Sequence, residues 1–384
     1  MNGRIIHPAG IRFAAHYGAF YFAFGAFLPY LPVWLESRGL SPEMIGIALG
    51  GSMLGRILLA PLGASWMDGA SRRRDAVVGF AWAGLAGFLL LVPIRDYVLL
   101  TIVAALAGAI FSGQIPLVDA FASWSSRKQN FAFGPARAAG SATFIIANLA
   151  AGALIGQFGG EAVLVWMTGG AALAVASAQF LPVGERVRPA AGVARAPLRL
   201  LLSKPFVLAL AASALIQSSH GFYYAFSAIS WQADGIPPQT VGALWSTGVL
   251  AEIVFLTLSA RHLSRFQPGQ LMLIAAVAAI IRWSVTAFSP PLAVLFALQI
   301  MHALTFAAAY LGFLKFAGDH APDGLQASTQ AANSALSGGL ALAVMSIASG
   351  VIYDLFGGAG FAFMALPAAA GGVCACLLLR VRTP

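Results

Sequence analysis

The chain contains few charged residues. Only 9% of its 384 residues are Asp, Glu, Lys or Arg, whereas 59% are hydrophobic. A water-soluble protein of this length would have to expose much of that apolar surface, which argues against a soluble fold. Apolar stretches of roughly 20 residues, long enough to cross a bilayer, recur along the chain. They lack the polar–apolar alternation of barrel strands, so the sequence predicts an all-helical integral membrane protein.

Cysteine is also scarce. The two cysteines, Cys374 and Cys376, are two positions apart in the last apolar stretch and so lie on different sides of a helix. They predict neither a disulfide nor a metal site. The sequence shows no Gly-rich phosphate loop, nucleophile elbow or cluster of metal ligands. We therefore expect no cofactor, no bound metal and no enzymatic activity.

Basic residues outnumber acidic ones, 22 to 13, which gives a net charge of +9. Most of them lie in alternate connections between the apolar stretches, such as those containing Arg72 and Arg127. This distribution follows the positive-inside rule of membrane proteins rather than the pattern of a nucleic-acid-binding surface. It predicts a multi-pass protein of the bacterial inner membrane, with both termini in the cytoplasm and no nucleic-acid partner.

A polar internal segment divides the chain. Residues 184–204 contain two prolines and several basic residues, which predicts a cytoplasmic linker. We expect one six-helix bundle in residues 1–183 and a second in residues 205–384.

The two halves repeat each other. Three residues around the first predicted loop recur in the second half at one constant spacing: Gly39 as Gly235, Pro42 as Pro238 and Gly46 as Gly242. A second match, between AGALIGQFGG and SGVIYDLFGG, has nearly the same spacing. Parallel six-helix repeats are typical of major facilitator transporters. The sequence therefore predicts about twelve transmembrane helices in two pseudo-symmetric bundles, the major facilitator fold.

Five charged residues interrupt the apolar stretches: Arg56, Asp119, Arg137, Glu252 and Arg282. A charge at membrane depth costs on the order of 3 kcal/mol, so each should face a cavity or a partner. Arg56 and Glu252 are separated by the repeat spacing, which predicts opposite charges facing each other across a central cavity. The alternative is a buried ion pair that only fastens the halves. We expect Asp119 to pair with Arg137.

These pairings leave Arg282 without an acidic partner. A guanidinium in that position would bind a small organic carboxylate through two parallel hydrogen bonds. We therefore expect Arg56 and Arg282 to contact an anionic, partly apolar substrate.

The segment PLVDAFASWSSRKQNFAFGPARAAG resembles lactose permease and its proton-symport relatives, and this resemblance implies that Asp119 and Arg137 bind substrate. Arg282 in IIRWSVT and His302 in QIMHALTF match the proton-coupling network of the same permeases, but Thr305 stands where the relatives have a carboxylate. GFYYAFSAISWQADG and VLAEIVF are similar to the phenylpropionate permease branch of the family. That similarity implies uptake of an aromatic carboxylate.

Two further predicted helices carry polar and aromatic residues at helical spacing. They form the series Gln217, His220, Tyr224, Ser227 and Trp231, and the series Gln326, Gln330, Asn333 and Ser337. Each series is predicted to lie on one helical face, which lines either a cavity or a neighbouring helix. We expect His220, Tyr224, Gln330 and Asn333 to contact the substrate.

The segment ASWMDGASRRR matches the loop signature of the major facilitator superfamily, an Asp followed by basic residues. The match implies that Asp68, Arg72 and Arg73 form a latch for one conformation, with both arginines solvated. Ordinary positive-inside charges beside a helix-end acid are the alternative.

We therefore expect a proton-coupled importer of a small organic anion resembling 3-phenylpropionate, working by alternating access as a monomer in the lipid bilayer. Glu252 is expected to carry the proton and to release Arg56 when protonated, with His302 and Arg282 in the coupling network. One alternative is a proton-coupled sugar or nucleoside symporter. Another, of a different class, is a membrane sensor built on a transporter fold.

Overall fold

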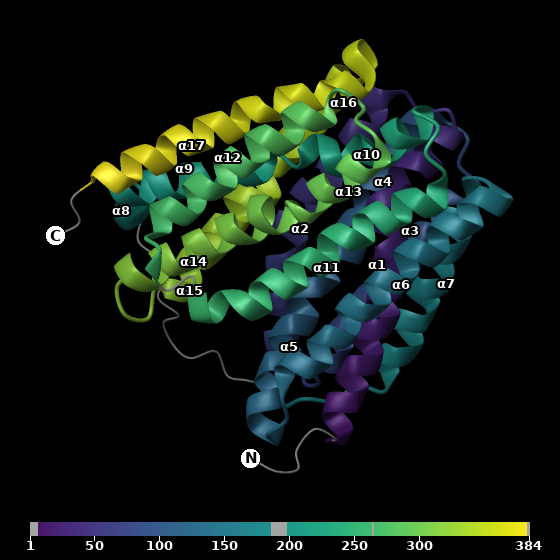
Figure 1. The fold of residues 1–384 in the computed structure, drawn as a ribbon. Helices are drawn as coiled ribbons and strands as arrows, with labels where there is room; N and C mark the ends of the chain where they lie inside the picture. Colours follow the sequence, from purple (N-terminus) through teal and green to yellow (C-terminus); the bar gives the residue numbers. More distant parts are fainter. Residues whose placement is uncertain (1–6, 186–197, 263–264, 382–384) are drawn as a thin grey trace. The chain divides into compact units, whose positions relative to one another are not determined.

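The computed structural model describes residues 7–185, 198–262 and 265–381 (Figure 1). Helix packing divides the chain into two compact units. Unit 1 comprises Met1–Ala191 and Ile236–Ala243, and unit 2 comprises Gly192–Gly235 and Leu244–Pro384. Residues 186–197 of the predicted linker lie outside the described residues, and the predicted domain boundaries stay a prediction.

Helices make up most of the described residues of unit 1. Its helices are α1 (Pro8–Ser37), α2 (Pro42–Gly69), α3 (Arg74–Leu91), α4 (Tyr97–Ser112), α5 (Gln114–Gln129), α6 (Phe133–Phe158) and α7 (Glu161–Gln179). α1 packs along α6 and α7, and α2 packs along α4. Residues that cap helix N-termini define two of the starts: Ser41 Oγ accepts from Met44 N at 3.4 Å, and Asp96 accepts from Leu99 N at 2.8 Å.

Unit 2 has more interruptions in its helices. Its elements are α8 (Leu198–Leu201), α9 (Lys204–Ser218), α10 (Gly221–Ala233), α11 (Pro238–His262, beginning in unit 1), α12 (Pro268–Thr286), α13 (Leu292–Ile300), η2 (Ala303–Ala308), α14 (Ala309–His320), α15 (Gln326–Ser334), η3 (Ala335–Ala341), α16 (Leu342–Phe356), η4 (Gly357–Met364) and α17 (Ala365–Arg380). α17 runs alongside α9 and α12 (Figure 1).

Two kinds of interruption correct the sequence-based view of these helices. A turn at residues 219–220 separates α9 from α10, and the η2 and η3 segments are π-helical. Both features shift side chains around the helix axis, and π-helical turns are frequent at functional sites. The prediction that each polar series keeps one continuous α-helical face is therefore wrong.

Within the described residues, 11 helical stretches are long and apolar enough to cross a membrane. The last of them, Gln326–Arg380, is 55 residues long and is broken at Gly357, whose φ is 52°. Large apolar side chains stay exposed on many of these helices; Leu58 is 70% and Val165 is 74% exposed. Such a surface suits lipid rather than water, and the predicted all-helical membrane fold is confirmed.

The internal repeat is visible in the backbone. Gly39 and Gly235 have φ values of 87° and 83°, and each precedes a helix that begins at proline. Gly159 and Gly357, from the second sequence match, have φ values of 76° and 52°. Glycine adopts this left-handed conformation without the steric cost that a Cβ would impose, so the repeated glycines mark repeated turns.

Candidate solute-binding and coupling sites

In unit 1 a charged and aromatic cluster lies where α1, α5 and α6 meet. Nε of Arg137 on α6 lies 3.2 Å from Oδ1 of Asp119 on α5. Two tyrosines of α1 hold this ion pair: Tyr17 donates to Asp119 Oδ1 at 2.6 Å, and Tyr21 Oη accepts from Arg137 Nη2 at 2.5 Å. The predicted pairing of Asp119 with Arg137 is present.

The cluster combines a cation with aromatic faces. The guanidinium carbon of Arg137 lies 5.3 Å from the ring centroid of Tyr17 and 4.5 Å from that of Tyr21. Gly140 leaves room for the Tyr21 ring, because a Cβ at position 140 would lie 2.6 Å from a carbon of that ring. The side chains of Asp119 and Arg137 are 37% and 30% exposed, so a solute can reach both. Tyr17, which precedes Tyr21 by one helical turn, was not among the predicted site residues.

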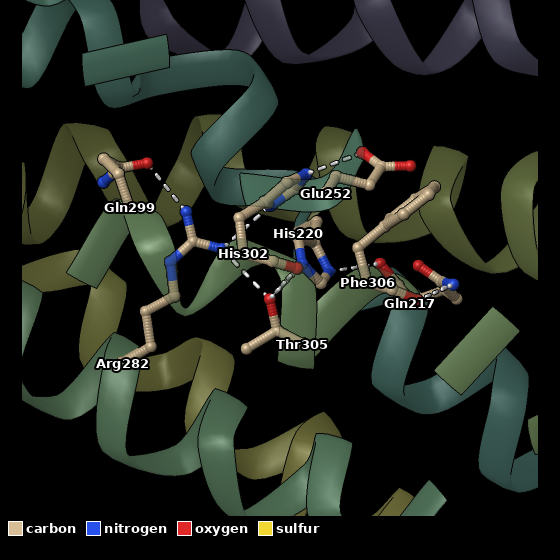
Figure 2. Close-up of polar contacts among 8 residues, drawn as sticks. All are labelled: Gln217, His220, Glu252, Arg282, Gln299, His302, Thr305 and Phe306. Atoms are coloured by element: carbon tan, nitrogen blue, oxygen red, sulfur yellow. Dashed lines mark hydrogen bonds and ion pairs between the residues drawn. The ribbon is translucent and has the colours of Figure 1, made fainter. Parts of the chain in front are cut away.

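A second cluster, in unit 2, surrounds Arg282 of α12 (Figure 2). Its side chain is fully buried. Three side chains accept from its N–H groups: Gln299 Oε1 at 2.8 Å, His302 Nδ1 at 3.0 Å and Thr305 Oγ1 at 3.1 Å. Its guanidinium carbon also lies 4.9 and 4.4 Å from the ring centroids of Tyr223 and Trp283.

This environment qualifies one prediction. Arg282 was expected to lack an acidic partner; neutral acceptors hold its Nη groups and aromatic rings flank it, which offsets part of the cost of burying its charge, while its Nε has no partner among the described residues. Gln299 and Tyr223 were missed as members of the cluster. Gln299 precedes His302 by three residues, the spacing that places two side chains on one helical face. Direct contact between Arg282 and substrate stays a prediction.

His302 connects Arg282 with Glu252 of α11. Its Nε2 lies 3.8 Å from Oε2 of Glu252, while its Nδ1 faces Arg282 (Figure 2). Because a guanidinium only donates hydrogen bonds, we assign Nδ1 as the acceptor and place the proton of a neutral His302 on Nε2, toward the carboxylate. A second proton on His302 would turn an N–H toward Arg282 and remove their hydrogen bond.

His220 extends this network to the break between α9 and α10. Its Nδ1 lies 3.2 Å from the carbonyl oxygen of Gln217, and its Nε2 lies 3.1 Å from Thr305 Oγ1. Since the carbonyl only accepts, Nδ1 carries the proton and Nε2 accepts from the Thr305 hydroxyl. Thr305 thus receives a hydrogen bond from Arg282, and its single hydroxyl hydrogen is shared between the carbonyl oxygen of His302 at 3.2 Å and Nε2 of the fully buried His220.

The remaining predicted solute contacts are spread over both units. Arg56 of α2, Tyr224 of α10 and Gln330 of α15 are half-buried, and Asn333 is buried. The side-chain oxygens of Gln330 and Asn333 are buried and have no hydrogen-bond partner among the described residues. Buried amide oxygens usually have one, so both are candidates for polar solute contacts. The opposition of Arg56 and Glu252 stays a prediction, since they belong to different units.

The predicted latch residues divide into two pairs. Asp68 accepts from Arg73 Nη2 at 2.8 Å, whereas Arg72 pairs with Asp75 at 3.0 Å. The expectation that Arg73 is solvated is wrong: its side chain is only 8% exposed, and its guanidinium lies 5.1 Å from the ring centroid of Trp124. A latch function for Asp68, Arg72 and Arg73 stays a prediction.

Known sequences resemble this chain along most of its length. The sequence model described as the MFS_1 like family matches residues 11–365. The probable 3-phenylpropionic acid transporter of Escherichia coli (strain K12) is 32% identical over 376 residues, which cover 92% of this chain and 94% of the relative. The maltose permease of Geobacillus stearothermophilus is 26% identical over 347 residues, which cover 89% and 87% of the two chains.

Solved transporter structures share the fold. The nucleoside transporter NupG has a TM-score of 0.80 at 16% identity, covering 97% of this chain and 98% of its own. A bacterial homologue of the human lysosomal transporter Spinster, in an inward-facing and unoccupied conformation, has a TM-score of 0.76 at 13% identity, covering 98% of each chain. At these identities the likeness concerns the fold alone.

Proposed function

Because this chain belongs to the MFS_1 like family of the major facilitator superfamily, it is a multi-pass membrane transporter rather than an enzyme, and we propose that it imports a small aromatic carboxylate together with a proton. The observation that carries the proposal is the accessible guanidinium of Arg137, flanked by the rings of Tyr17 and Tyr21. The similarity to the Escherichia coli relative, a probable 3-phenylpropionic acid transporter, supports the same solute class.

Arg137 has donors left for a carboxylate. Its Nε is directed to Asp119 and one Nη2 hydrogen to Tyr21, while its Nη1 has no partner among the described residues. The edge formed by Nη1 and Nη2 can therefore donate two parallel hydrogen bonds to a carboxylate. An aromatic ring attached to that carboxylate would pack against the tyrosines, which a hydrophilic sugar would not do as well.

Proton coupling is assigned to Glu252, His302 and Arg282. An ionised Glu252 attracts the N–H on Nε2 of His302, which keeps Nδ1 free to accept from Arg282. Protonation of Glu252 removes that attraction, and His302 can then take the other tautomer and release Arg282. Proton binding would thus loosen a buried network in unit 2, which biases the transporter toward another conformation.

Uptake into proteoliposomes tests the proposal. Labelled 3-phenylpropionate, lactose and a nucleoside are compared under an imposed gradient, with the vesicle interior alkaline. We expect 3-phenylpropionate to accumulate and an uncoupler to abolish its accumulation. Accumulation of lactose or the nucleoside alone would contradict the solute class, and uptake that ignores the pH gradient would contradict proton coupling.

A sugar is the second candidate. The similarity to the maltose permease favours it, and the Asp119–Arg137 pair offers sugar hydroxyls both an acceptor and a donor. Maltose therefore belongs in the same uptake experiment.

A further inference from the structure

Two cavities of unit 2 meet at Arg380, the last residue of α17. The first, of about 580 Å³, lies beside the start of α12 and the ends of α14 and α17, and its polar lining includes Gln267, Asp319, His320 and Arg380. The second, of about 360 Å³, is a groove between α12 and α17 with a mainly apolar lining that includes Leu273, Ala276, Val277, Val373 and Cys376. Arg380 lines both cavities, so a polar chamber and an apolar groove adjoin.

The polar chamber holds one acid and one base that do not neutralise each other. Asp319 and Arg380 both line it, yet within the described part of the chain neither forms an ion pair or a hydrogen bond through its side chain. Both charges stay available to a ligand. A ligand with an anionic and a cationic group on separate atoms would complement the pair.

His320 adds a fixed acceptor to the same chamber. Its Nδ1 lies 3.1 Å from the carbonyl oxygen of Phe316, and its ring is stacked on the Phe316 ring with centroids 4.5 Å apart. Because the carbonyl only accepts, Nδ1 carries the proton of the neutral ring and Nε2 is left to accept. A primary ammonium group can donate to both Nε2 and the Asp319 carboxylate.

The apolar groove suits a hydrocarbon chain. Small residues form part of its lining: a Cβ at Gly372 would lie only 3.1 Å from that of Ala276. Val277 and Val373 also line it and are 49% and 59% exposed. The chamber lies at the end of α17 that the charge distribution predicts to be cytoplasmic, where lipid headgroups meet the protein, and the groove runs from there along α17 toward Ala369.

We propose that this combined site binds one glycerophospholipid with an ethanolamine headgroup. Arg380 holds the phosphate, Asp319 and His320 hold the primary ammonium, and the groove between α12 and α17 holds an acyl chain. A phosphatidylglycerol headgroup would leave Asp319 without a cation, and a phosphatidylcholine headgroup has no N–H to donate. The proposal is independent of the transported solute.

Cys376 provides a reporter, since its thiol is exposed and lines the groove. In the full-length Cys374→Ser protein, purified in detergent and stripped of lipid, the rate of N-ethylmaleimide labelling is measured with each phospholipid added. We expect phosphatidylethanolamine to slow labelling several-fold more than phosphatidylglycerol or phosphatidylcholine. Arg380→Gln should remove protection by all three lipids, and Asp319→Asn should remove the preference for ethanolamine.

Two matched controls, Arg199→Gln and Asp323→Asn, each remove an exposed charge of unit 2 that lies outside both cavities. Both variants should keep full protection by phosphatidylethanolamine. Val277→Trp, which fills the groove, should slow labelling without lipid and make the rate insensitive to lipid. Equal labelling rates with and without phosphatidylethanolamine would overturn the site, as would undiminished protection in Arg380→Gln. Equal protection by phosphatidylglycerol would overturn the headgroup assignment.

Discussion

Nη1 of Arg282 donates a hydrogen bond of 3.0 Å to Nδ1 of His302. This contact fixes which histidine nitrogen can hold the proton of the neutral ring, and the other nitrogen faces Glu252 at 3.8 Å. The imidazole of His302 therefore lies between the buried guanidinium of Arg282 and the carboxylate of Glu252. A second proton on His302 would turn an N–H toward this fully buried arginine, and a buried donor is costly to leave without an acceptor.

Glu252→Gln should abolish accumulation of the solute under a pH gradient while leaving exchange of labelled for unlabelled solute intact. The amide cannot take up the proton, but the two conformations of the loaded carrier can still interconvert. Accumulation and counterflow are measured in the same proteoliposomes. Glu43→Gln, an acid outside both clusters, is the matched control, and accumulation at the normal level in Glu252→Gln would exclude Glu252 as the proton carrier.

Two substitutions, His302→Asn and His302→Leu, distinguish a contribution of His302 to protein stability from a contribution to proton coupling. Leu removes the acceptor of Arg282 and should destabilise the protein by about 1–3 kcal/mol, since a buried donor loses its partner. Asn retains an acceptor, so it should keep most of the stability and lose coupling. Thermal unfolding in detergent and gradient-driven uptake are the two measurements. Normal coupling in His302→Asn would remove the histidine from the proton path.

Arg137→Lys should weaken solute binding about tenfold or more, because lysine cannot donate two parallel hydrogen bonds and a tenfold change corresponds to about 1.4 kcal/mol. Isothermal titration with 3-phenylpropionate measures the dissociation constant. Arg127→Lys is the control, as Arg127 is an exposed residue of α5 that donates to Ser123 Oγ. An unchanged dissociation constant for Arg137→Lys would place the carboxylate elsewhere.

Tyr17→Phe removes only the hydroxyl that donates to Asp119 at 2.6 Å. The ring remains beside Arg137, so the cation–π contact should persist while the carboxylate loses one donor. A hydrogen bond to a charged group contributes roughly 1.5–3 kcal/mol, and we expect solute binding to weaken by about tenfold. Tyr97→Phe, on α4 and outside the cluster, should bind normally. Wild-type affinity in Tyr17→Phe would show that Asp119 needs no support from α1.

Asp68→Asn tests the buried half of the predicted latch. It removes the acid partner of Arg73, whose side chain is only 8% exposed, and should lower the melting temperature and the rate of transport. Asp75→Asn is the matched control: it breaks the exposed pair with Arg72, and such pairs contribute less than about 1 kcal/mol. Equal effects of the two substitutions would contradict a special role for Asp68.

The membrane location, the repeat and the identity of most charged residues in the two clusters could be predicted from the amino acids alone. These follow from local properties: hydropathy sets the spans, glycine at repeated positions sets the turns, and a charge inside an apolar stretch needs a partner whatever its surroundings. The Asp119–Arg137 pair was predictable for that reason. So was the repeat of Gly39 at Gly235, since their positive φ angles suit glycine.

Which neighbours satisfy each charge depends on how the helices pack. Arg282 of α12 is held by side chains from α13 and the η2 region and by a ring of α10, and no local pattern brings these separate elements together. The burial of Arg73 beside Trp124 likewise depends on how the α2–α3 loop packs against α5. The hydrophobicity of each residue can be read directly from the sequence. Which side chains contact a buried charge depends instead on how distant segments pack, and on how turns and π-helices rotate side chains around the helix axis.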